Sequence, residues 1–197
     1  VQAALAHRAR TGHGQHVDMA LYDCMVAAQA NQNLNYLSTD HSPKRLGNAH
    51  PNIVPYQVFA VADGHVIIAC GSDRQFAALA LALDHPEWAQ DARFSTNPAR
   101  VAHRDDLTDA ITQALSDQSI ADAITLLETA GVPVGPIRSI GDALTDPHTD
   151  HAGLVIHPEG IPGVRSPFRF SDMELALDRA APGLGEHAHL FWEDQLT

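Results

Sequence analysis

Two aspartates, Asp18 and Asp23, are the only carboxylates among the first 37 residues. Residues 15–21 are predicted to form a strand and residues 22–37 a helix, so Asp23 falls where the strand gives way to the helix. Because α/β sheets place their chemistry at strand ends, Asp23 is a candidate catalytic residue. The alternative is a first-turn carboxylate that complements the helix dipole. Asp18 lies within the predicted strand and is expected to fix local hydrogen bonds.

A second candidate site is the loop from Gly47 to Asn52, whose residue types disfavour regular structure. Gly47 tolerates positive φ, Pro51 lacks a backbone donor and biases His50 toward extended geometry, and the asparagines can close local turns. Such a loop can bring backbone N–H groups close to a ligand. The alternative is an interdomain turn with capping side chains.

The loop leads into a predicted hairpin. Residues 56–61 and 65–70 are rich in strand-forming residues, and Asp63-Gly64 between them is a strong turn signal. The next segment, Gly71-Ser72-Asp73, supplies the N-cap of a helix over residues 75–83. Asp73 is therefore either part of this cap or a group that supports the active site.

Alternating helices and turns follow the hairpin. A helical turn at 87–94, an amphipathic helix at 101–116, a helix from Ser119 to Gly131 and an extended segment at 132–137 predict a small α+β domain. The preceding helix, strand and helix over residues 1–37 have the rhythm of a doubly wound α/β layer. After a short helix at 140–144, strands are predicted at 153–157 and 164–170, and a last helix runs to Leu196.

Five separately placed motifs resemble one family, the class III CoA-transferases, which share their fold with the α-methylacyl-CoA racemases. In chain order these motifs span Arg8–Asp23, Lys44–Phe76, Pro86–Arg100, Gly131–Ile137 and Gly183–His187. The third reads P-E-W-A-x-D-x-R-F-x-x-N-x-x-R, the fourth G-V-P-x-G-P-I and the fifth G-L-G-E-H. The resemblance covers nearly the whole chain. It lacks the N-terminal half of the family, and the chain begins without Met inside a helical pattern, which suggests a fragment.

The resemblance implies an α/β fold in which a Rossmann-like large domain is joined to a small α+β domain. Residues 1–45 would end the large domain and form the linker, residues 46–140 would form the small domain, and residues 141–197 would return to the large domain. The full-length protein would be an interlocked homodimer.

The resemblance also implies a covalent mechanism with Asp23 as the nucleophile, since the second aspartate of the family's D-x-x-x-x-D pattern matches Asp23. An aspartyl-CoA thioester on Asp23 would carry CoA from an acyl-CoA donor to a small carboxylic acid. The loop residues Gly47, Asn48, Ala49 and His50 would shield acyl intermediates from water. Acyl-CoA would be a substrate, and no cofactor would be bound covalently.

Two other functions stay open at this stage. A CoA-thioester racemase would need an acid/base pair that flanks the α-carbon, with Asp23 as one member and a histidine upstream as the other. Racemase-like members place a glutamate at the position of Asp73, whereas the G-S-D-R-Q-F run here is closer to the transferases. The third possibility is a non-catalytic CoA-thioester-binding module.

The amino-acid composition limits the kinds of molecule that the protein is expected to bind. With 12 Lys and Arg against 24 Asp and Glu, the formal net charge of -12 would repel an extended nucleic-acid backbone. The few phosphates of CoA could still be met locally by Lys44 and Arg45. No apolar run approaches the roughly 18 residues of a membrane span and no signal-peptide pattern is visible, so a cytoplasmic location without membrane contact is expected.

Neither the cysteines nor the histidines form a metal motif. Cys24 and Cys70 lie far apart in apolar runs, which predicts buried free thiols. Three of the histidine pairs are closely spaced, but their segments are not helices that would present several ligands to one ion. No metal is therefore expected; the pairs are His13 and His16, His148 and His151, and His187 and His189.

Overall fold

The computed structural model describes residues 1–187 and divides the chain into two compact units, Val1–Ala49 and the residues from His50 onward. The predicted helix at 188–196 lies outside the described residues.

The first unit contains three helices, α1 (Gln2–Thr11), α2 (Leu21–Ala28) and α3 (Ala30–Thr39). Helix α1 ends before Gly12, which adopts a left-handed conformation with φ of 75° and donates its N–H to the Arg8 carbonyl. None of the three helices contains a buried residue. The apolar side chains of this unit are therefore exposed, among them Met19, Leu21, Tyr22, Leu34 and Leu37.

Two predictions for this unit are wrong. Residues 13–20 form no strand, because a strand needs a hydrogen-bonded neighbour and no segment of residues 1–49 pairs with them. The helix predicted at 22–37 is interrupted at Gln29. There the Val26 carbonyl accepts the Gln29 N–H at 3.3 Å and the Asn33 side-chain amide at 2.5 Å. In a continuous helix the Val26 carbonyl would instead accept the N–H of Ala30, four residues further along the chain.

The second unit begins with the predicted hairpin, which is confirmed. Strands β1 (Tyr56–Val61) and β2 (Gly64–Ala69) pair antiparallel, and β3 (Val134–Pro136) adds to β2 to complete a three-stranded sheet. Alternate side chains turn inward, so that Phe59 and Val61 from β1 and Val66 and Ile68 from β2 are buried. One face of the sheet is thus available for helix packing.

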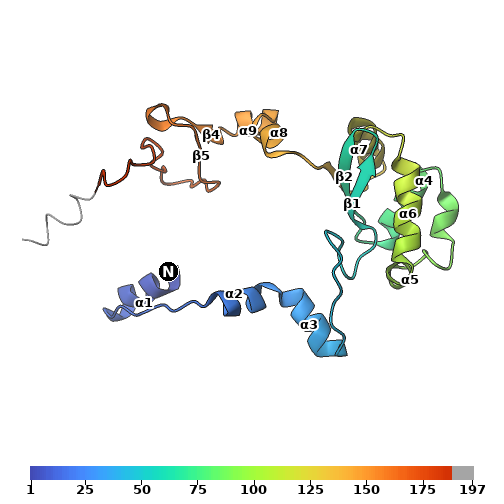
Figure 1. The fold of residues 1–197 in the computed structure, drawn as a ribbon, viewed down its shortest axis with the longest axis horizontal. Helices are drawn as coiled ribbons and strands as arrows, with labels where there is room; N and C mark the ends of the chain where they lie inside the picture. The colour runs from blue at the N-terminus through green and yellow to red at the C-terminus, as the bar shows by residue number, and fades with distance from the viewer. Residues whose placement is uncertain (188–197) are drawn as a thin grey trace, which may run out of the picture. The chain divides into compact units, whose positions relative to one another are not determined.

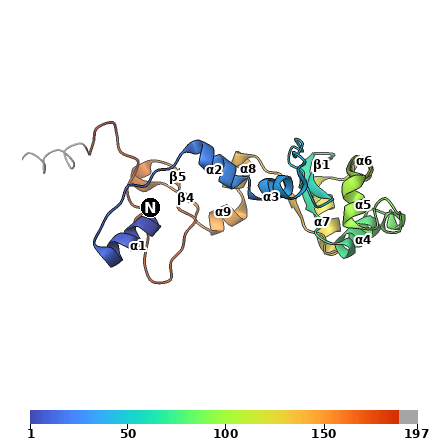
Figure 2. The same cartoon turned by 90° about the horizontal axis from the view of Figure 1, so that it is seen from below.

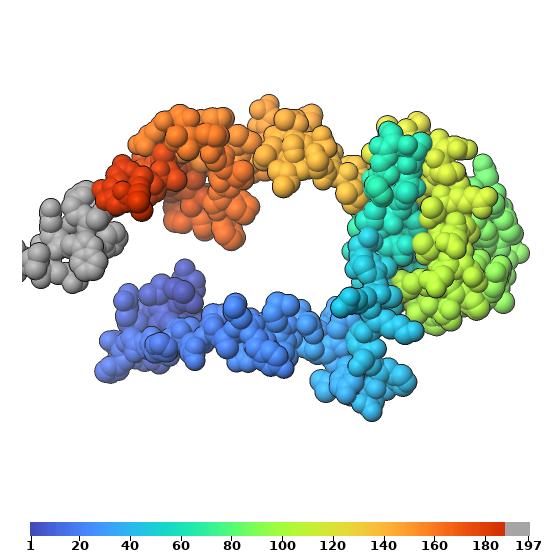
Figure 3. All heavy atoms as spheres, viewed as in Figure 1, coloured from blue at the N-terminus to red at the C-terminus, as the bar shows by residue number. Residues whose placement is uncertain are grey.

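Four helices and a 3-10 turn lie between β2 and β3 in the chain: α4 (Asp73–Ala82), η1 (Pro86–Ala89), α5 (Asn97–Ala102), α6 (Arg104–Leu115) and α7 (Ile120–Thr129). Helix α6 packs against β1, and α7 packs against β2 and β3; Figures 1 and 2 show these helices beside the strands. The apolar stripe of α6 is fully buried, as predicted: Leu107, Ile111 and Leu115 are 0% exposed. In Figure 3 the atoms of residues 56–136 form a dense body, coloured cyan to yellow.

The helix predicted at 101–116 is divided between two helices, because α5 ends at Ala102 and α6 begins at Arg104, with His103 between them in a non-helical conformation. Helix caps elsewhere follow the sequence closely. The Ser72 hydroxyl accepts the Gln75 N–H at 3.3 Å at the start of α4, and the Ser119 hydroxyl accepts the Asp122 N–H at 3.1 Å at the start of α7. These serines fix where the two helices begin.

After the small sheet the chain forms short elements: α8 (Ile140–Leu144), α9 (Pro147–His151), β4 (Val155–Ile156), η2 (Pro158–Gly160) and β5 (Gly163–Val164). Helix α8 matches its prediction. The strands predicted at 153–157 and 164–170 are limited to two residues each, because β4 and β5 pair only with one another. None of the helices described for residues 1–187 is long and apolar enough to cross a membrane.

The domain boundaries at residues 45 and 140 stay a prediction that limited proteolysis can check. Residues 40–46 are exposed and form neither helix nor strand, whereas most of α4 is held against the core. A broad-specificity protease should therefore make its first cut within residues 1–140 between Ser38 and Lys44. Mass spectrometry of the early fragments identifies that cut. Early cleavage within residues 75–83 instead would contradict the domain map.

Candidate active site

Asp23 lies in the first turn of α2, three residues after the N-cap Ala20. Its side chain is exposed, and within residues 1–187 no hydrogen bond or ion pair engages its carboxylate. The helix start has no side-chain cap, so the orphan N–H groups of the first turn lie near this carboxylate along the chain. Asp18 is also exposed and belongs to the irregular segment before α2.

The predicted loop residues Gly47, Asn48 and Ala49 form a tight turn in the first unit. The Leu46 carbonyl accepts the Ala49 N–H at 3.0 Å, and Gly47 has a φ of 59°. A Cβ placed on Gly47 would meet no described atom within 4 Å, so the glycine is needed there for its left-handed backbone rather than for close packing. The preceding Lys44 and Arg45 are exposed.

From His50 onward the same loop is bound firmly to the second unit. The His50 N–H donates to the Tyr56 carbonyl at 2.9 Å, and the imidazole stacks on the Tyr56 ring with the centroids 5.3 Å apart. The His50 Nδ1 atom accepts the Asn52 N–H at 3.2 Å. His50 is therefore held in place through its backbone and its ring.

Asn97, the first residue of α5, holds the next part of the loop. Its Oδ1 atom accepts the Val54 N–H at 3.1 Å, and its Nδ2 atom donates to the Asn52 carbonyl at 2.8 Å. One amide side chain thus satisfies a donor and an acceptor of the loop backbone, as a neighbouring strand would.

Arg100 is completely buried, and its guanidinium is surrounded by acceptors. Nε donates to the Val54 carbonyl at 2.6 Å, Nη1 donates to the Phe94 carbonyl at 2.8 Å, and Nη2 donates to the Asp73 carboxylate at 2.8 Å. The guanidinium carbon lies 4.4 Å from the centroid of the Phe76 ring, a cation–π contact.

The structure thus gives Asp73 a definite partner. The N-cap of α4 is Ser72, and Asp73 is the first helical residue, with its carboxylate turned to Arg100. The contacts of Asp73 are those of an anchor for a buried cation, and its role as a supporting residue of the active site stays a prediction.

Arg104, the first residue of α6, is the third side chain that binds the loop backbone, after Asn97 and Arg100. Its Nη2 atom donates to two consecutive carbonyls, those of His50 and Pro51, each at 2.9 Å. Its Nη1 atom is buried and has no partner among the described residues. Burial lowers the pKa of the Arg104 guanidinium, and the charge of Asp105 partly offsets this effect.

Asn97, Arg100 and Arg104 were not identified as site residues from the sequence, although Asn97 and Arg100 stand within the P-E-W-A motif. A usable signal was present. Positions 100, 104, 107, 111 and 115 follow helical spacing, so the two arginines continue the apolar stripe of α6. A cation on a buried stripe must find acceptors, and here the acceptors are loop carbonyls.

Cys70 lies in the same core and is 0% exposed, which confirms the predicted buried thiol. Burial raises the pKa of Cys70 to about 12, although the charge of Arg100 acts in the opposite direction. The thiol is therefore protonated at neutral pH and is a poor nucleophile. Cys24 differs from the prediction, since it is only partly buried.

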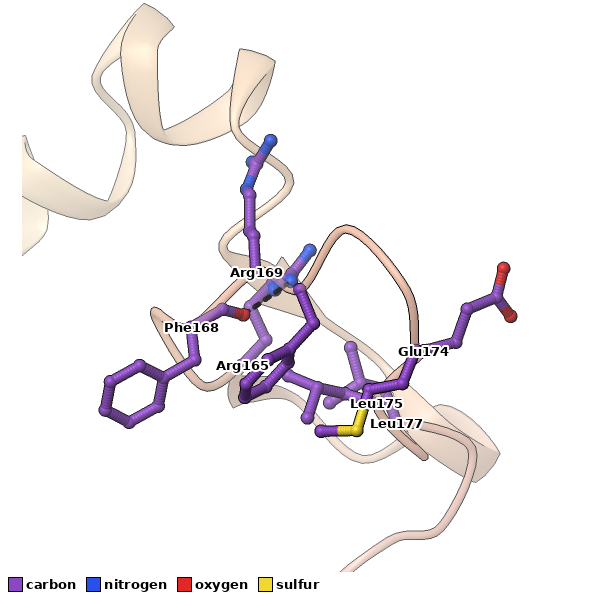
Figure 4. A pocket seen from close by; sticks show the side chains of 8 residues that line it. Arg165, Phe168, Arg169, Glu174, Leu175 and Leu177 are labelled. Carbon is purple, nitrogen blue, oxygen red and sulfur yellow. Dashed lines mark hydrogen bonds between the residues drawn. The ribbon is translucent and has the colours of Figure 1, made fainter.

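A hollow of about 410 Å³ lies in the segment after β5 and is shown in Figure 4. The Arg165 guanidinium donates to the Phe168 carbonyl at 3.4 Å, and Arg169 donates to the Ala152 carbonyl at 2.7 Å. Both arginines are thus engaged with nearby backbone. None of the predicted site residues lines this hollow, whose walls are Arg165, Phe168, Arg169, Phe170, Met173, Glu174, Leu175 and Leu177.

No group of three or more His, Cys, Asp or Glu side chains among residues 1–187 is arranged to hold a metal ion.

Comparison with known proteins identifies the family. The model of CoA-transferase family III matches residues 1–188. The chain belongs to CoA-transferase family III. The α/β class III fold predicted from the sequence is confirmed by a solved CAIB/BAIF family protein from Brucella suis. That structure has 49% identity and a TM-score of 0.80, with 100% of this chain and 52% of the other covered.

Two curated relatives are similar over most of the chain. The succinate–glutarate CoA-transferase of Agrobacterium fabrum is 46% identical over 192 residues, which cover 95% of this chain and 48% of the relative. The acetyl-CoA:oxalate CoA-transferase of Acetobacter aceti is 35% identical over 187 residues, with 94% and 48% covered. The chain therefore spans about half the length of these relatives.

The contacts of Arg100 predict a large effect on stability. Arg100→Met should lower the free energy of unfolding by about 3–5 kcal/mol, because it leaves buried carbonyls without donors. Arg93→Met is the matched control: Arg93 is exposed and pairs with Asp91, so its loss should cost about 0.5 kcal/mol or less. Denaturant unfolding measures both. Equal effects of the two substitutions would show that the buried bonds contribute little.

Proposed function

We propose that the full-length protein is a CoA-transferase that moves CoA from an acyl-CoA thioester to a small carboxylic acid. The observation that carries this proposal is the match to CoA-transferase family III over residues 1–188, together with relatives named as CoA-transferases. These names also favour transfer over the racemase alternative. Since the chain spans about half the length of its relatives, we expect residues 1–197 alone to be inactive.

Asp23 is proposed as the nucleophile. Its carboxylate attacks the thioester carbonyl of the donor and expels CoA thiolate, which gives a mixed anhydride. The thiolate then attacks the aspartyl carbonyl, releases the donor as a carboxylate and leaves an aspartyl-CoA thioester. The exposed carboxylate in the first turn of α2 supports this role, because no partner within residues 1–187 has to be displaced before attack.

The second half of the reaction repeats these steps in reverse order. The acceptor carboxylate attacks the aspartyl thioester and expels CoA thiolate, and the thiolate attacks the acceptor carbonyl of the new anhydride. Acyl-CoA leaves and the Asp23 carboxylate is regenerated, with no net proton transfer. Each anhydride oxyanion needs backbone donors and a dry site.

The acceptor is proposed to be a dicarboxylic acid, and the donor the CoA thioester of a small carboxylic acid. This follows the names of the relatives, which include succinate, glutarate and oxalate, and acetyl-CoA as one donor. Lys44 and Arg45 are proposed to meet CoA phosphates, since both are exposed cations next to the loop in sequence. A cytoplasmic homodimer is the expected state of the full-length protein.

The loop Gly47–His50 is proposed to cover the acyl intermediates and to exclude water. Small residues suit a loop that closes over a reactive acyl group. The left-handed Gly47 makes the turn possible, and the anchored His50 fixes its far end.

Atom balance gives a direct test of Asp23. Because the acceptor oxygen becomes the bridging oxygen of the second anhydride, turnover with an oxygen-18-labelled dicarboxylate should leave label in the Asp23 carboxylate. Mass spectrometry of the peptide that contains Asp23 detects it. Asp23→Asn should abolish transfer, whereas Asp18→Ala should retain it. Turnover without label on Asp23 would contradict the assignment.

The loop role predicts a selective effect of Gly47→Val in the full-length protein. A β-branched side chain is strained at positive φ, so turnover should fall and more acyl-enzyme should be lost to hydrolysis. Gly153→Val is a matched control, because Gly153 has a φ of 58° and open space around its Cβ position. Both changes should cost about 1–2 kcal/mol of stability. Equal turnover in the two variants would reduce the loop to a connector.

A further inference from the structure

The three side chains that bind the loop His50–Pro55 differ in how fully their polar atoms are used. Asn97 satisfies one donor and one acceptor, and all three donor atoms of Arg100 that bear hydrogen are paired. Arg104 uses Nη2 for two carbonyls and leaves Nη1 buried and unpaired within the described residues. The fully paired Arg100 thus acts as an anchor of the fold, whereas the partly paired Arg104 indicates a residue with another purpose.

We propose that Arg104 is a positioning residue for the shielding loop Gly47–His50: it fixes the end of the loop through the His50 and Pro51 carbonyls and thereby sets how well acyl intermediates are kept from water. The proposal rests on the function proposed above. It adds a residue and a measurable property, the partition of the acyl-enzyme between transfer and hydrolysis.

The geometry supports this assignment. The Arg104 Nη2 atom donates to two consecutive carbonyls at 2.9 Å, so it orients the two peptide groups that flank Pro51. His50 follows Ala49 directly, and the Ala49 N–H closes the turn to Leu46. Any shift of His50 is therefore transmitted by the chain to the turn that contains Gly47.

Stability alone gives little reason for a guanidinium at this position. Burial disfavours the charge of Arg104, and a buried donor without a partner offsets part of what the two hydrogen bonds contribute. An apolar side chain of similar length can fill the same space, and because His50 and Pro51 are only partly buried, water can replace the donor that their carbonyls lose. The two bonds to the loop are what such a side chain would lose.

The test uses the full-length protein and three variants: Arg104→Met, Arg104→Lys and the control Arg93→Met. Hydrolysis and transfer are measured together with succinyl-CoA and glutarate. Arg104→Met should raise the ratio of hydrolysis to transfer by about tenfold, since small displacements of positioning groups have effects of this size. Its Tm should stay within about 3 °C of the unchanged protein. Arg104→Lys should restore part of the ratio, because an ammonium group can also donate to two carbonyls. Arg93→Met should leave the ratio unchanged.

Hydrogen exchange provides a readout that does not depend on activity. Loss of the two bonds in Arg104→Met should speed exchange of the Ala49 and His50 N–H groups, while α6 core amides near Ile111 stay protected. Unchanged exchange, or a Tm loss as large as that of Arg100→Met, would overturn the positioning role.

The outcomes separate the two proposals. If oxygen-18 enters Asp23 but Arg104→Met leaves the hydrolysis ratio unchanged, Arg104 has no positioning role and the transferase function stands. If exchange at Ala49 and His50 accelerates but the unchanged protein transfers no CoA, the loop contact is real and the proposed function, with the catalytic part of this inference, is wrong.

Discussion

The second unit depends on one buried cation. Arg100 has no exposed surface, and such a charge is tolerated only where acceptors replace the water that it loses. The acceptors come from three places in the chain: the loop carbonyl of Val54, the Phe94 carbonyl after η1 and the carboxylate of Asp73 at the start of α4. Removing any of them would leave the guanidinium short of a partner, so the loop, the turn and the helix are fixed together.

This dependence connects the packing of the small domain to its proposed chemistry. Arg100 lies between Asn97 and Arg104 in the chain, and all three bind the backbone of the loop that begins at His50. The interior of the domain thus determines the conformation of a surface segment. Upstream of His50 the Ala49 N–H closes the turn to the Leu46 carbonyl, so the backbone is held by hydrogen bonds on both sides of the Ala49–His50 bond.

Features that depend on local sequence could be predicted. The hairpin at Asp63-Gly64, the serine cap of α4, the apolar stripe of α6 and the turn at Gly47 all arise from neighbouring residues, and the structure contains each of them. Features that depend on contacts between distant parts of the chain were harder to predict from the sequence. A strand at 15–21 requires a partner that residues 1–49 do not supply. The loop carbonyls that accept from Arg100 and Arg104 lie 46 to 54 positions away in the chain. The family motif that ends at Arg100 did not indicate which residues the Arg100 side chain contacts.

The spacing of these partners also imposes an order on synthesis. The loop leaves the ribosome before α5 and α6, and the middle strand β2 is made long before β3, which completes the sheet. Until Arg104 has emerged, the carbonyls of His50, Pro51 and Val54 can be solvated only by water, because their donors do not yet exist. The nascent segment from His50 therefore cannot complete these contacts and its three-stranded sheet until the chain has been made as far as Pro136. A pause in translation before that point would leave the loop, the hairpin edge and the apolar face of the sheet exposed, so that chaperones could bind them.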